Sequence, residues 1–183
     1  MSITVERLFF ALWPDQKVRE SLSEAYAKIP QLSGQGRLVN PANFHITLHF
    51  LGNIPVQQVA CFLDYARQVQ SQPFQLEITQ SGYFKKPQIS WLAPVEIPRA
   101  LIKLQGLLGR KIRNCGFQPE VRTFRPHVTM ARKITQNFKM QQIETINWHV
   151  DSFALVESVS RSGSVEYQVK SSFPLIEKPA TGI

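Results

Sequence analysis

Two tetrapeptides of one pattern contain the residues best suited to do chemistry: a histidine, any residue, a threonine and an apolar residue. They are His45-Ile46-Thr47-Leu48 and His127-Val128-Thr129-Met130. The chain has eight threonines and four histidines in 183 residues. Two or more such pairs therefore arise by chance in about one comparable chain in a hundred. We interpret the repetition as functional.

The spacing within each motif has a structural meaning. Successive side chains of a strand point to opposite faces, so a histidine and a threonine two places apart project together. The residues between and after them, such as Ile46 and Val128, would then face the core. Two such strands side by side would present two imidazoles and two hydroxyls to one pocket.

This set of groups suits phosphoryl transfer. One histidine takes a proton from water while the other protonates the departing oxygen, and each transfer contributes about 10²–10⁴-fold. The hydroxyls of Thr47 and Thr129 can donate to phosphate oxygens as negative charge develops. Histidine is suitable because its pKa of about 6.5 allows one copy to be neutral and the other protonated near neutral pH.

Two other interpretations compete with catalysis. A single motif of this kind on a strand is usually a structural histidine, and histidine is also a common metal ligand. Two copies in matched contexts favour catalysis, and no H-E-x-x-H pattern, cysteine pair or aspartate cluster accompanies them. We therefore expect neither a metal nor a cofactor. His49 continues the His45–Thr47 face, as a pocket-rim residue or an ordinary exposed one, and His149 receives no role.

The segments around the motifs alternate between strand and helix patterns, which predicts an α+β fold in one domain over 1–183, with a frayed tail from about 176. Strand-like runs lie at 8–12, 44–51, 74–79, 89–93, 127–132, 152–159 and 167–173, with a hairpin connection at 161–164. Helical periodicity follows Asp15, begins again near Val56, and runs from Pro98 to Gly116.

The charge predicts an acidic partner. The net charge is +8 and the sequence pI is about 9.8, with lysines and arginines scattered along the chain. Nucleic acid is the first candidate for such a balance. The longest apolar run, 8–13, is far shorter than the roughly 20 residues that a membrane span requires. We expect no membrane association and no signal peptide.

The two cysteines, Cys61 and Cys115, are too few for a disulfide framework and lack metal-ligand spacing. Each lies in an apolar helical pattern, so we expect a small buried hydrophobic residue at both positions. These features indicate a reducing, cytoplasmic location.

The motifs and their flanks resemble the two-histidine (2H) phosphoesterase superfamily. The flanks are Arg7-Leu-Phe-Phe-Ala11, 43–52 (NFHITLHFLG) and 126–132 (PHVTMAR). Together they are similar to the bacterial RNA 2′,3′-cyclic phosphodiesterases, also called the 2′-5′ RNA ligase family, from about Arg7 to about Leu175. The resemblance implies a bilobal α+β fold, with two pseudo-symmetric lobes of antiparallel sheet, outer helices and a central cleft.

The resemblance also implies an activity and roles. A 2′,3′-cyclic phosphate at an RNA end is hydrolysed to a 2′-phosphomonoester without metal, and tRNA halves can be joined reversibly through a 2′-5′ linkage. His45 and His127 are then catalytic; we expect His45 to protonate O3′ and His127 to activate water. Thr47, Thr129 and Arg132 bind phosphate. Because Arg132 has the wrong alternation relative to His127, we expect a bend in that strand, or a side chain that reaches around.

Several possibilities stay open at this point. Phe9 matches an aromatic position of the family and could stack on the terminal base, or belong to the core. The chain could be an RNA-binding or nucleotide-binding module of the same fold with vestigial catalysis. It could also cleave a 2′-5′ oligonucleotide or a small cyclic nucleotide. We expect a monomer, with RNA ends such as tRNA fragments, or nucleotides with a cyclic phosphate, as partners.

Overall fold

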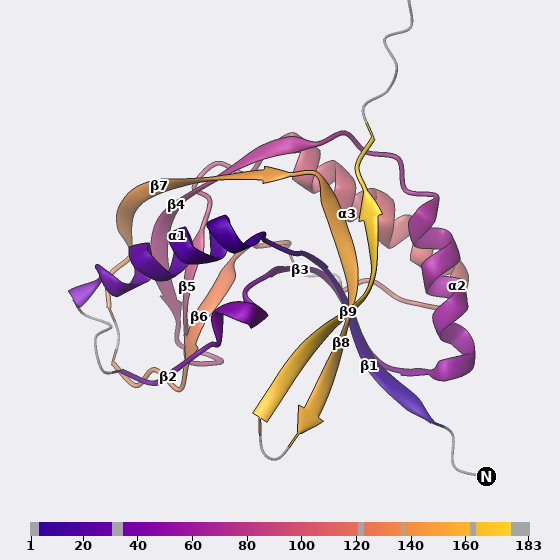
Figure 1. Cartoon of the computed structure of the whole chain (residues 1–183), viewed down its shortest axis with the longest axis horizontal. Helices are drawn as coiled ribbons and strands as arrows, with labels where there is room; N and C mark the ends of the chain where they lie inside the picture. The colour runs from indigo at the N-terminus through magenta and orange to yellow at the C-terminus, as the bar shows by residue number, and fades with distance from the viewer. Residues whose placement is uncertain (1–3, 31–34, 121–122, 137, 162–163, 177–183) are drawn as a thin grey trace, which may run out of the picture.

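The computed structural model describes residues 4–30, 35–120, 123–136, 138–161 and 164–176. Within these residues the chain forms one nine-stranded sheet whose main path runs β7-β4-β5-β6-β3-β1-β8-β9, with β2 paired to β6. All strand pairs are antiparallel (Figure 1). The strands are β1 Val5–Leu12, β2 Arg37–Leu38, β3 Ile46–Pro55, β4 Phe74–Phe84, β5 Ile89–Ala93, β6 Val128–Arg132, β7 Gln141–Val150, β8 Ser152–Arg161 and β9 Ser164–Pro174. The predicted α+β class is confirmed.

The three α-helices form where apolar residues recur at helical spacing. They are α1 Gln16–Ala27, α2 Val56–Arg67 and α3 Arg99–Ile112. Asp15 caps α1 as predicted, since its side chain accepts from the backbone N–H of Val18 at 2.8 Å. A 3₁₀ turn extends α3 to Gly116, whose φ of 79° is the left-handed conformation that glycine adopts freely.

The sheet divides into two halves of four strands along this path. The first is β7-β4-β5-β6 and the second is β3-β1-β8-β9, and the only described pairing between them is Ile46 opposite Val128. Helix α1 packs against β7, whereas α2 and α3 pack against each other beside β3 (Figure 1). This arrangement agrees with the two lobes that the family resemblance implies.

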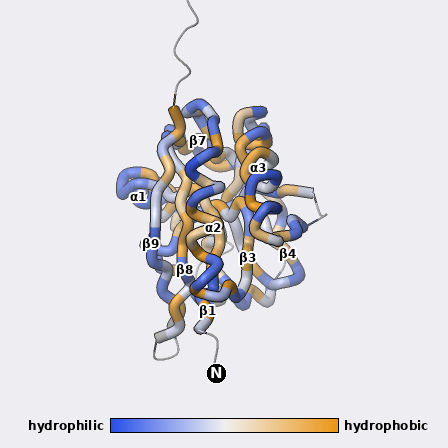
Figure 2. Tube along the Cα trace, turned by 90° about the vertical axis from the view of Figure 1, so that its right-hand side faces the viewer, coloured by the Kyte–Doolittle hydropathy of each residue, from blue (hydrophilic) through white to orange (hydrophobic). Residues whose placement is uncertain are grey.

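The sheet is apolar on both faces. The helices cover the larger core, and Figure 2 shows apolar residues of α2 and α3 beside β3, β8 and β1. The other face carries two small clusters, one around Phe9 and Val156 and one around Trp91. Each small cluster lies in a different half of the sheet, beside one of the two motifs.

Two strands were missed at the sequence level. Strand β7 alternates buried Ile146, Trp148 and Val150 with exposed residues, but its first half is mostly polar, with Ile143 as its one apolar residue, because it is an edge strand. Strand β2 has only two residues, too few to give a periodic signal. The predicted tail and the tip of the 161–164 hairpin fall largely outside the described residues; Arg161 and Ser164 pair across β8 and β9.

The prediction for the cysteines was wrong. Cys61 on α2 and Cys115 after α3 form a disulfide across 54 residues of sequence, and both are half-buried. They meet because α2 and the end of α3 pack side by side. No spacing rule links positions so far apart, so the sequence alone could not reveal the pair.

Candidate active site

The two motifs lie next to each other at the junction of the two halves. The residues that follow the histidines, Ile46 and Val128, are both fully buried and pair across β3 and β6. This pairing places His45 and His127 at the start of adjacent antiparallel strands. The predicted juxtaposition of the two motifs is confirmed.

Both histidines are oriented by the same backbone contact. The Nδ1–H of His45 donates to the carbonyl of Asn43 at 2.7 Å, and the Nδ1–H of His127 donates to the carbonyl of Arg125, also at 2.7 Å. Each bond holds the proton on Nδ1 of the neutral ring and leaves Nε2 as the base. The Thr47 hydroxyl donates to Nε2 of His45 at 3.1 Å.

The first motif strand contains a β-bulge directly after its threonine. Thr47 lies opposite Ala11, but His49 lies opposite Phe10, so Leu48 is an extra residue in β3. The bulge reverses the alternation of side chains that follow it. Leu48 and His49 are therefore both buried.

The second motif strand has the same irregularity at the same motif position. Thr129 lies opposite Trp91 and Ala131 lies opposite Ser90, which leaves Met130 as the extra residue in β6. Met130 and Ala131 are both buried. The two strands therefore share a β-bulge in addition to the tetrapeptide motif.

The bulge accounts for the odd offset of Arg132. Because β6 gains one residue after Thr129, Arg132 returns to the face of Thr129 and is exposed. Its positive charge acts on His45 and lowers that histidine's pKa. The bend expected at this position is confirmed.

His45 sits in an aromatic enclosure. Its ring contacts Phe9 at 4.9 Å between centroids, Tyr167 at 5.2 Å edge-on, and Trp13 at 5.9 Å in a stacked arrangement. Phe9 is only 3% exposed, so its ring supports His45 from within the core. This burial favours the core interpretation of Phe9 over base stacking.

Burial lowers the pKa of His45 to about 4, despite the favourable hydrogen bond to Asn43. The positive charges of His127 and Arg132 lower it further. His45 is therefore neutral at neutral pH in the free protein. His127 contacts Phe84 edge-on at 5.3 Å and is partly exposed.

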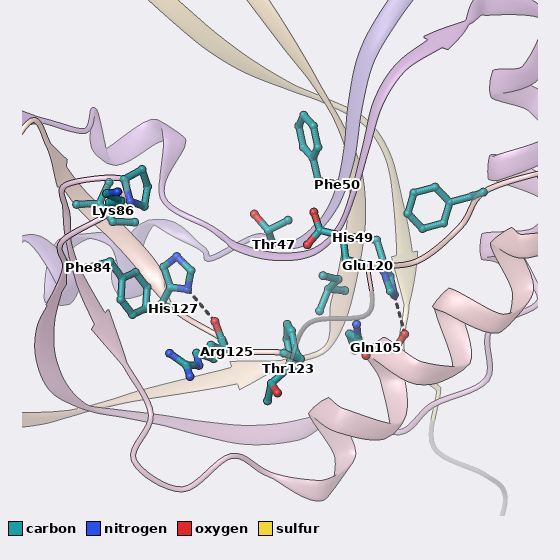
Figure 3. Close-up of a pocket in the computed structure, with 15 residues that line it drawn as sticks. Thr47, His49, Phe50, Phe84, Lys86, Gln105, Glu120, Thr123, Arg125 and His127 are labelled. Atoms are coloured by element: carbon teal, nitrogen blue, oxygen red, sulfur yellow. Dashed lines mark hydrogen bonds between the residues drawn. The ribbon is translucent and has the colours of Figure 1, made fainter.

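A cavity of about 610 Å³ opens between the two motifs (Figure 3). The motif residues Thr47 and His127 line it, together with Lys86 and Arg125. Three of the predicted site residues, His45, Thr129 and Arg132, are not among the described residues that line this cavity. Lys86 and Arg125 do not stand out from the other scattered lysines and arginines in the sequence, because loop residues carry no periodic signal.

His49 is not the exposed strand residue that one interpretation allowed. It is 6% exposed, lines the cavity, and donates from Nε2 to the carbonyl of Gln105 on α3 at 2.8 Å. The bulge at Leu48 turns the ring towards this helix. Burial lowers its pKa, which the Gln105 carbonyl and the Glu120 charge partly offset.

The described residues contain neither a metal-binding cluster nor a membrane-spanning helix. Among the described residues, no three of the histidine, cysteine, aspartate and glutamate side chains gather into a group that could hold a metal ion. No helix in the same part of the chain is long and apolar enough to cross a membrane.

The sequence matches the model of one protein family, described as "LigT like Phosphoesterase", over residues 12–91 and again over 92–167. The first segment contains the His45 motif and the second contains the His127 motif. The chain belongs to the LigT-like phosphoesterase family. Each matched segment contributes strands to both halves of the sheet: the first contains β3 and β4, and the second contains β6, β7 and β8.

Two relatives of this LigT-like chain carry the same name, RNA 2′,3′-cyclic phosphodiesterase. That of Thermus thermophilus is 30% identical, with 92% of this chain and 90% of the relative covered. That of Escherichia coli is 28% identical, with 88% of this chain and 92% of the relative covered. Both span nearly the whole chain.

Solved structures show the same LigT-like fold. E. coli LigT complexed with 3′-AMP superposes with a TM-score of 0.86 at 26% identity, covering 95% of this chain and all of that one. A structure described as a phosphoesterase gives a TM-score of 0.87 at 26% identity, with the same coverage. The fold expected from the family resemblance is confirmed.

Proposed function

We propose that this protein opens RNA 2′,3′-cyclic phosphate ends to 2′-phosphomonoesters, with His45 and His127 as its acid–base pair. The observation that supports this most is the pair of matched motifs. Each histidine is oriented by the carbonyl two residues before it, and each threonine is followed by a bulge. The relatives named RNA 2′,3′-cyclic phosphodiesterase support the substrate class.

The cyclic phosphate would lie between the motifs, within reach of both Nε2 atoms. Thr47 and Thr129 would donate to its non-bridging oxygens, and the exposed Arg132 would balance its charge. The E. coli LigT structures with 3′-AMP and with phosphate show that relatives of this fold hold such groups. The chemistry uses this chain's own side chains and needs no bound metal.

The proposed roles of the two histidines require the pKa of His45 to change during the reaction. His127 would take a proton from the attacking water, and His45 would protonate O3′ as it leaves. A pKa of about 4 makes His45 a poor resting acid, so the acid role requires its pKa to rise when substrate binds. The negative phosphate supplies this change, because it offsets the charges of His127 and Arg132 that lower the pKa of His45.

Joining would use the 5′-hydroxyl of a second RNA end in place of water, with O3′ again leaving and the same histidine roles, to form a 2′-5′ linkage; cleavage of that linkage, the reverse step, would exchange the roles. We propose RNA ends such as tRNA fragments as partners and a monomer as the working unit. The cytoplasmic location stays a prediction, and the Cys61–Cys115 disulfide removes the free-thiol argument for it.

Product analysis tests the proposal. Purified protein is incubated, with EDTA present, with an RNA oligonucleotide that ends in a 2′,3′-cyclic phosphate, and the product is compared with 2′- and 3′-phosphate standards. A 2′-phosphate product supports the enzyme and O3′ as the leaving oxygen. A 3′-phosphate reverses the leaving oxygen. Binding without turnover would leave only the phosphate-binding module.

Salt dependence measures how much of the RNA the protein contacts. If Lys86, Arg125 and other basic residues contact backbone phosphates, KM for an oligonucleotide should rise steeply with salt. KM for a nucleoside 2′,3′-cyclic phosphate should change far less. If salt changes neither KM, the natural substrate is the size of a mononucleotide.

A further inference from the structure

Helix α3 carries a row of basic side chains that the proposed reaction does not use. The row consists of Arg99, Lys103, Arg110 and Arg113, which are all exposed. Successive members are four, seven and three residues apart, so they lie on one face of the helix and of the 3₁₀ turn that extends it. Gly106 lies in the middle of the row and adds no side chain. We call this row the α3 basic face.

The α3 basic face has no acidic counterpart on its own helix. The chain contains no aspartate or glutamate between Glu96 and Glu120, where its basic residues are those of the α3 basic face and Lys111. Lys111 donates from Nζ to Oε1 of Gln68 on the chain after α2, at 3.2 Å. No ion pair between described residues involves a side chain of the α3 basic face. Its charge is therefore not neutralised within the described structure.

Helix stability does not account for this arrangement. Arg110 and Arg113 lie at the C-terminal end, where positive charge interacts favourably with the helix dipole. Arg99 is instead the first residue of the helix, where positive charge is unfavourable, and the first turn has no acidic residue. Arg99 and Lys103 are also four residues apart, a spacing at which like charges repel. A negatively charged partner would relieve both effects.

The α3 basic face is continuous with the catalytic cavity. Gln105 of the same helix lines that cavity (Figure 3). Ile102 is three residues from both Gln105 and Arg99, a spacing that makes each pair neighbours on the helix surface. Ile102 is 53% exposed. A strand that leaves the cavity past Gln105 therefore crosses Ile102 and then reaches the basic side chains.

The length and charge of this surface fit a single strand of RNA. From Arg99 to Arg113 it extends over about 20 Å at 1.5 Å per residue. Lysine and arginine bind the phosphates of a nucleic acid without regard to base sequence. An anionic lipid surface would also attract these charges, but it would need no path to the histidines, so the continuity with the cavity favours RNA.

We propose that the α3 basic face binds backbone phosphates of the RNA that precedes the cyclic phosphate. The terminal nucleotide then lies in the cavity, and the upstream strand passes over Ile102 and along α3. Longer substrates should therefore bind more tightly than a single nucleotide. This inference rests on the proposed hydrolysis of RNA ends.

Substrate length tests the inference. KM is measured for a nucleoside 2′,3′-cyclic phosphate and for an oligonucleotide of about twelve nucleotides with the same end. Wild type is compared with Lys103→Gln/Arg110→Gln/Arg113→Gln, in which glutamine keeps a similar helix propensity. We expect the variant to raise KM for the oligonucleotide about tenfold at low salt, and to reduce the slope of log KM against log salt by about 2. KM for the nucleoside substrate and both kcat values should stay unchanged.

A second triple variant controls for net charge. Lys17→Gln/Lys28→Gln/Lys139→Gln removes the same charge from exposed positions on α1, at its end and before β7. An equal rise in KM for both triple variants would overturn the inference. An unchanged KM in the α3 variant would also overturn it, and binding of phosphatidylserine vesicles by wild type but not by the α3 variant would then assign the surface to lipid.

A binding measurement separates this inference from the proposed function. If wild type hydrolyses no cyclic phosphate, the proposed function fails. The Kd of a labelled oligonucleotide with a 2′-phosphate end, measured by fluorescence anisotropy, then decides the inference by the same comparison of variants. A weaker Kd in the α3 variant alone supports the α3 basic face as an RNA-binding surface, and equal Kd values for both triple variants contradict it.

Discussion

The two motif strands have the same local structure in different surroundings. In β3 and in β6 a histidine donates to the carbonyl two residues earlier, a threonine follows, and a bulge comes next. The His45 ring is enclosed by Phe9, Trp13 and Tyr167, whereas His127 is partly exposed beside Phe84. The motif sets the geometry, and the lobe around it sets the affinity for a proton.

Because their surroundings differ, the two histidines can take different roles in the proposed reaction. Two identical sites close together would compete for one proton without a preferred order. Burial in the aromatic enclosure keeps His45 neutral in the free protein, and in the proposed reaction a bound phosphate would couple substrate binding to protonation of His45. The following variants test this comparison, beginning with the largest expected effect.

Replacing either histidine should remove most activity. His45→Ala and His127→Ala should each lower kcat by about 10²–10⁴-fold, because each removes one proton transfer. Circular dichroism should show an unchanged fold. His149→Ala, at an exposed edge-strand position, is the matched control and should keep full activity. A motif variant with normal kcat would contradict the assignment.

Replacing the threonines should have a smaller effect. Thr47→Val and Thr129→Val each remove a hydroxyl that would donate to the phosphate, which lowers kcat by about 10²-fold. Thr47→Val should also change the titration of His45, because the Thr47 hydroxyl bonds its Nε2. Thr47→Ser and Thr129→Ser restore the hydroxyl and should recover activity. If valine and serine variants behave alike, the hydroxyls are not phosphate ligands.

Stability should reveal the low pKa of His45. In the unfolded chain this histidine titrates near its ordinary pKa of 6.5, and in the folded chain at about 4. The unfolded state therefore binds the proton more readily, so stability is lost as pH falls from about 6.5 to 4, by at most about 3 kcal/mol. Urea unfolding of wild type and His45→Gln at pH 7.5 and 4.5 measures this. An identical pH response of both proteins would contradict the low pKa.

Product binding should raise the pKa of His45. An NMR titration of the histidine ring should give a pKa near 4 in the free protein and a higher pKa with 2′-AMP bound. Tyr167→Ala should raise the free value part of the way, since it opens the enclosure to water. Phe84→Leu, which alters the surroundings of His127 instead, should leave it unchanged. A value that stays near 4 with 2′-AMP would make His45 the base.

The smallest expected effect concerns the packing of His49 against α3. This contact involves the strand β3. Gly109→Ala places a methyl group 3.0 Å from the His49 ring and should destabilise the protein by about 1 kcal/mol. Gly106→Ala, on the same helix with its nearest atom at 3.6 Å, should stabilise it by up to about 1 kcal/mol. Equal effects in urea unfolding would show that His49 is not fixed by α3.

The sequence predicts the central features of the site because they are local. The H-x-T spacing, the strands that carry it and the cap at Asp15 all depend on residues within a few positions of each other. The odd offset of Arg132 even predicts an irregularity, which the bulge at Met130 provides. Element types follow from the same local patterns, whereas the two sheet halves were expected only from the family resemblance.

Features that depend on distant contacts were not predicted. The Cys61–Cys115 disulfide needs α2 and α3 to be adjacent. The burial of His49 needs a bulge and a glycine 60 residues later, at Gly109. The edge position of β7 allows most of its first half to be polar, so the alternating strand pattern there is weak. No pattern among neighbouring residues of the sequence predicts any of these features.

Leaving-group substitution tests the central claim most directly. A 2′,3′-cyclic substrate with sulfur in place of O3′ expels a thiolate, which needs little protonation because a thiol has a pKa of about 8.5. If His45 is the acid and His127 the base, His45→Ala should recover most of its lost rate on this substrate, while His127→Ala should stay inactive. Recovery of His127→Ala alone would exchange the roles, and recovery of neither variant would contradict acid–base catalysis by this pair.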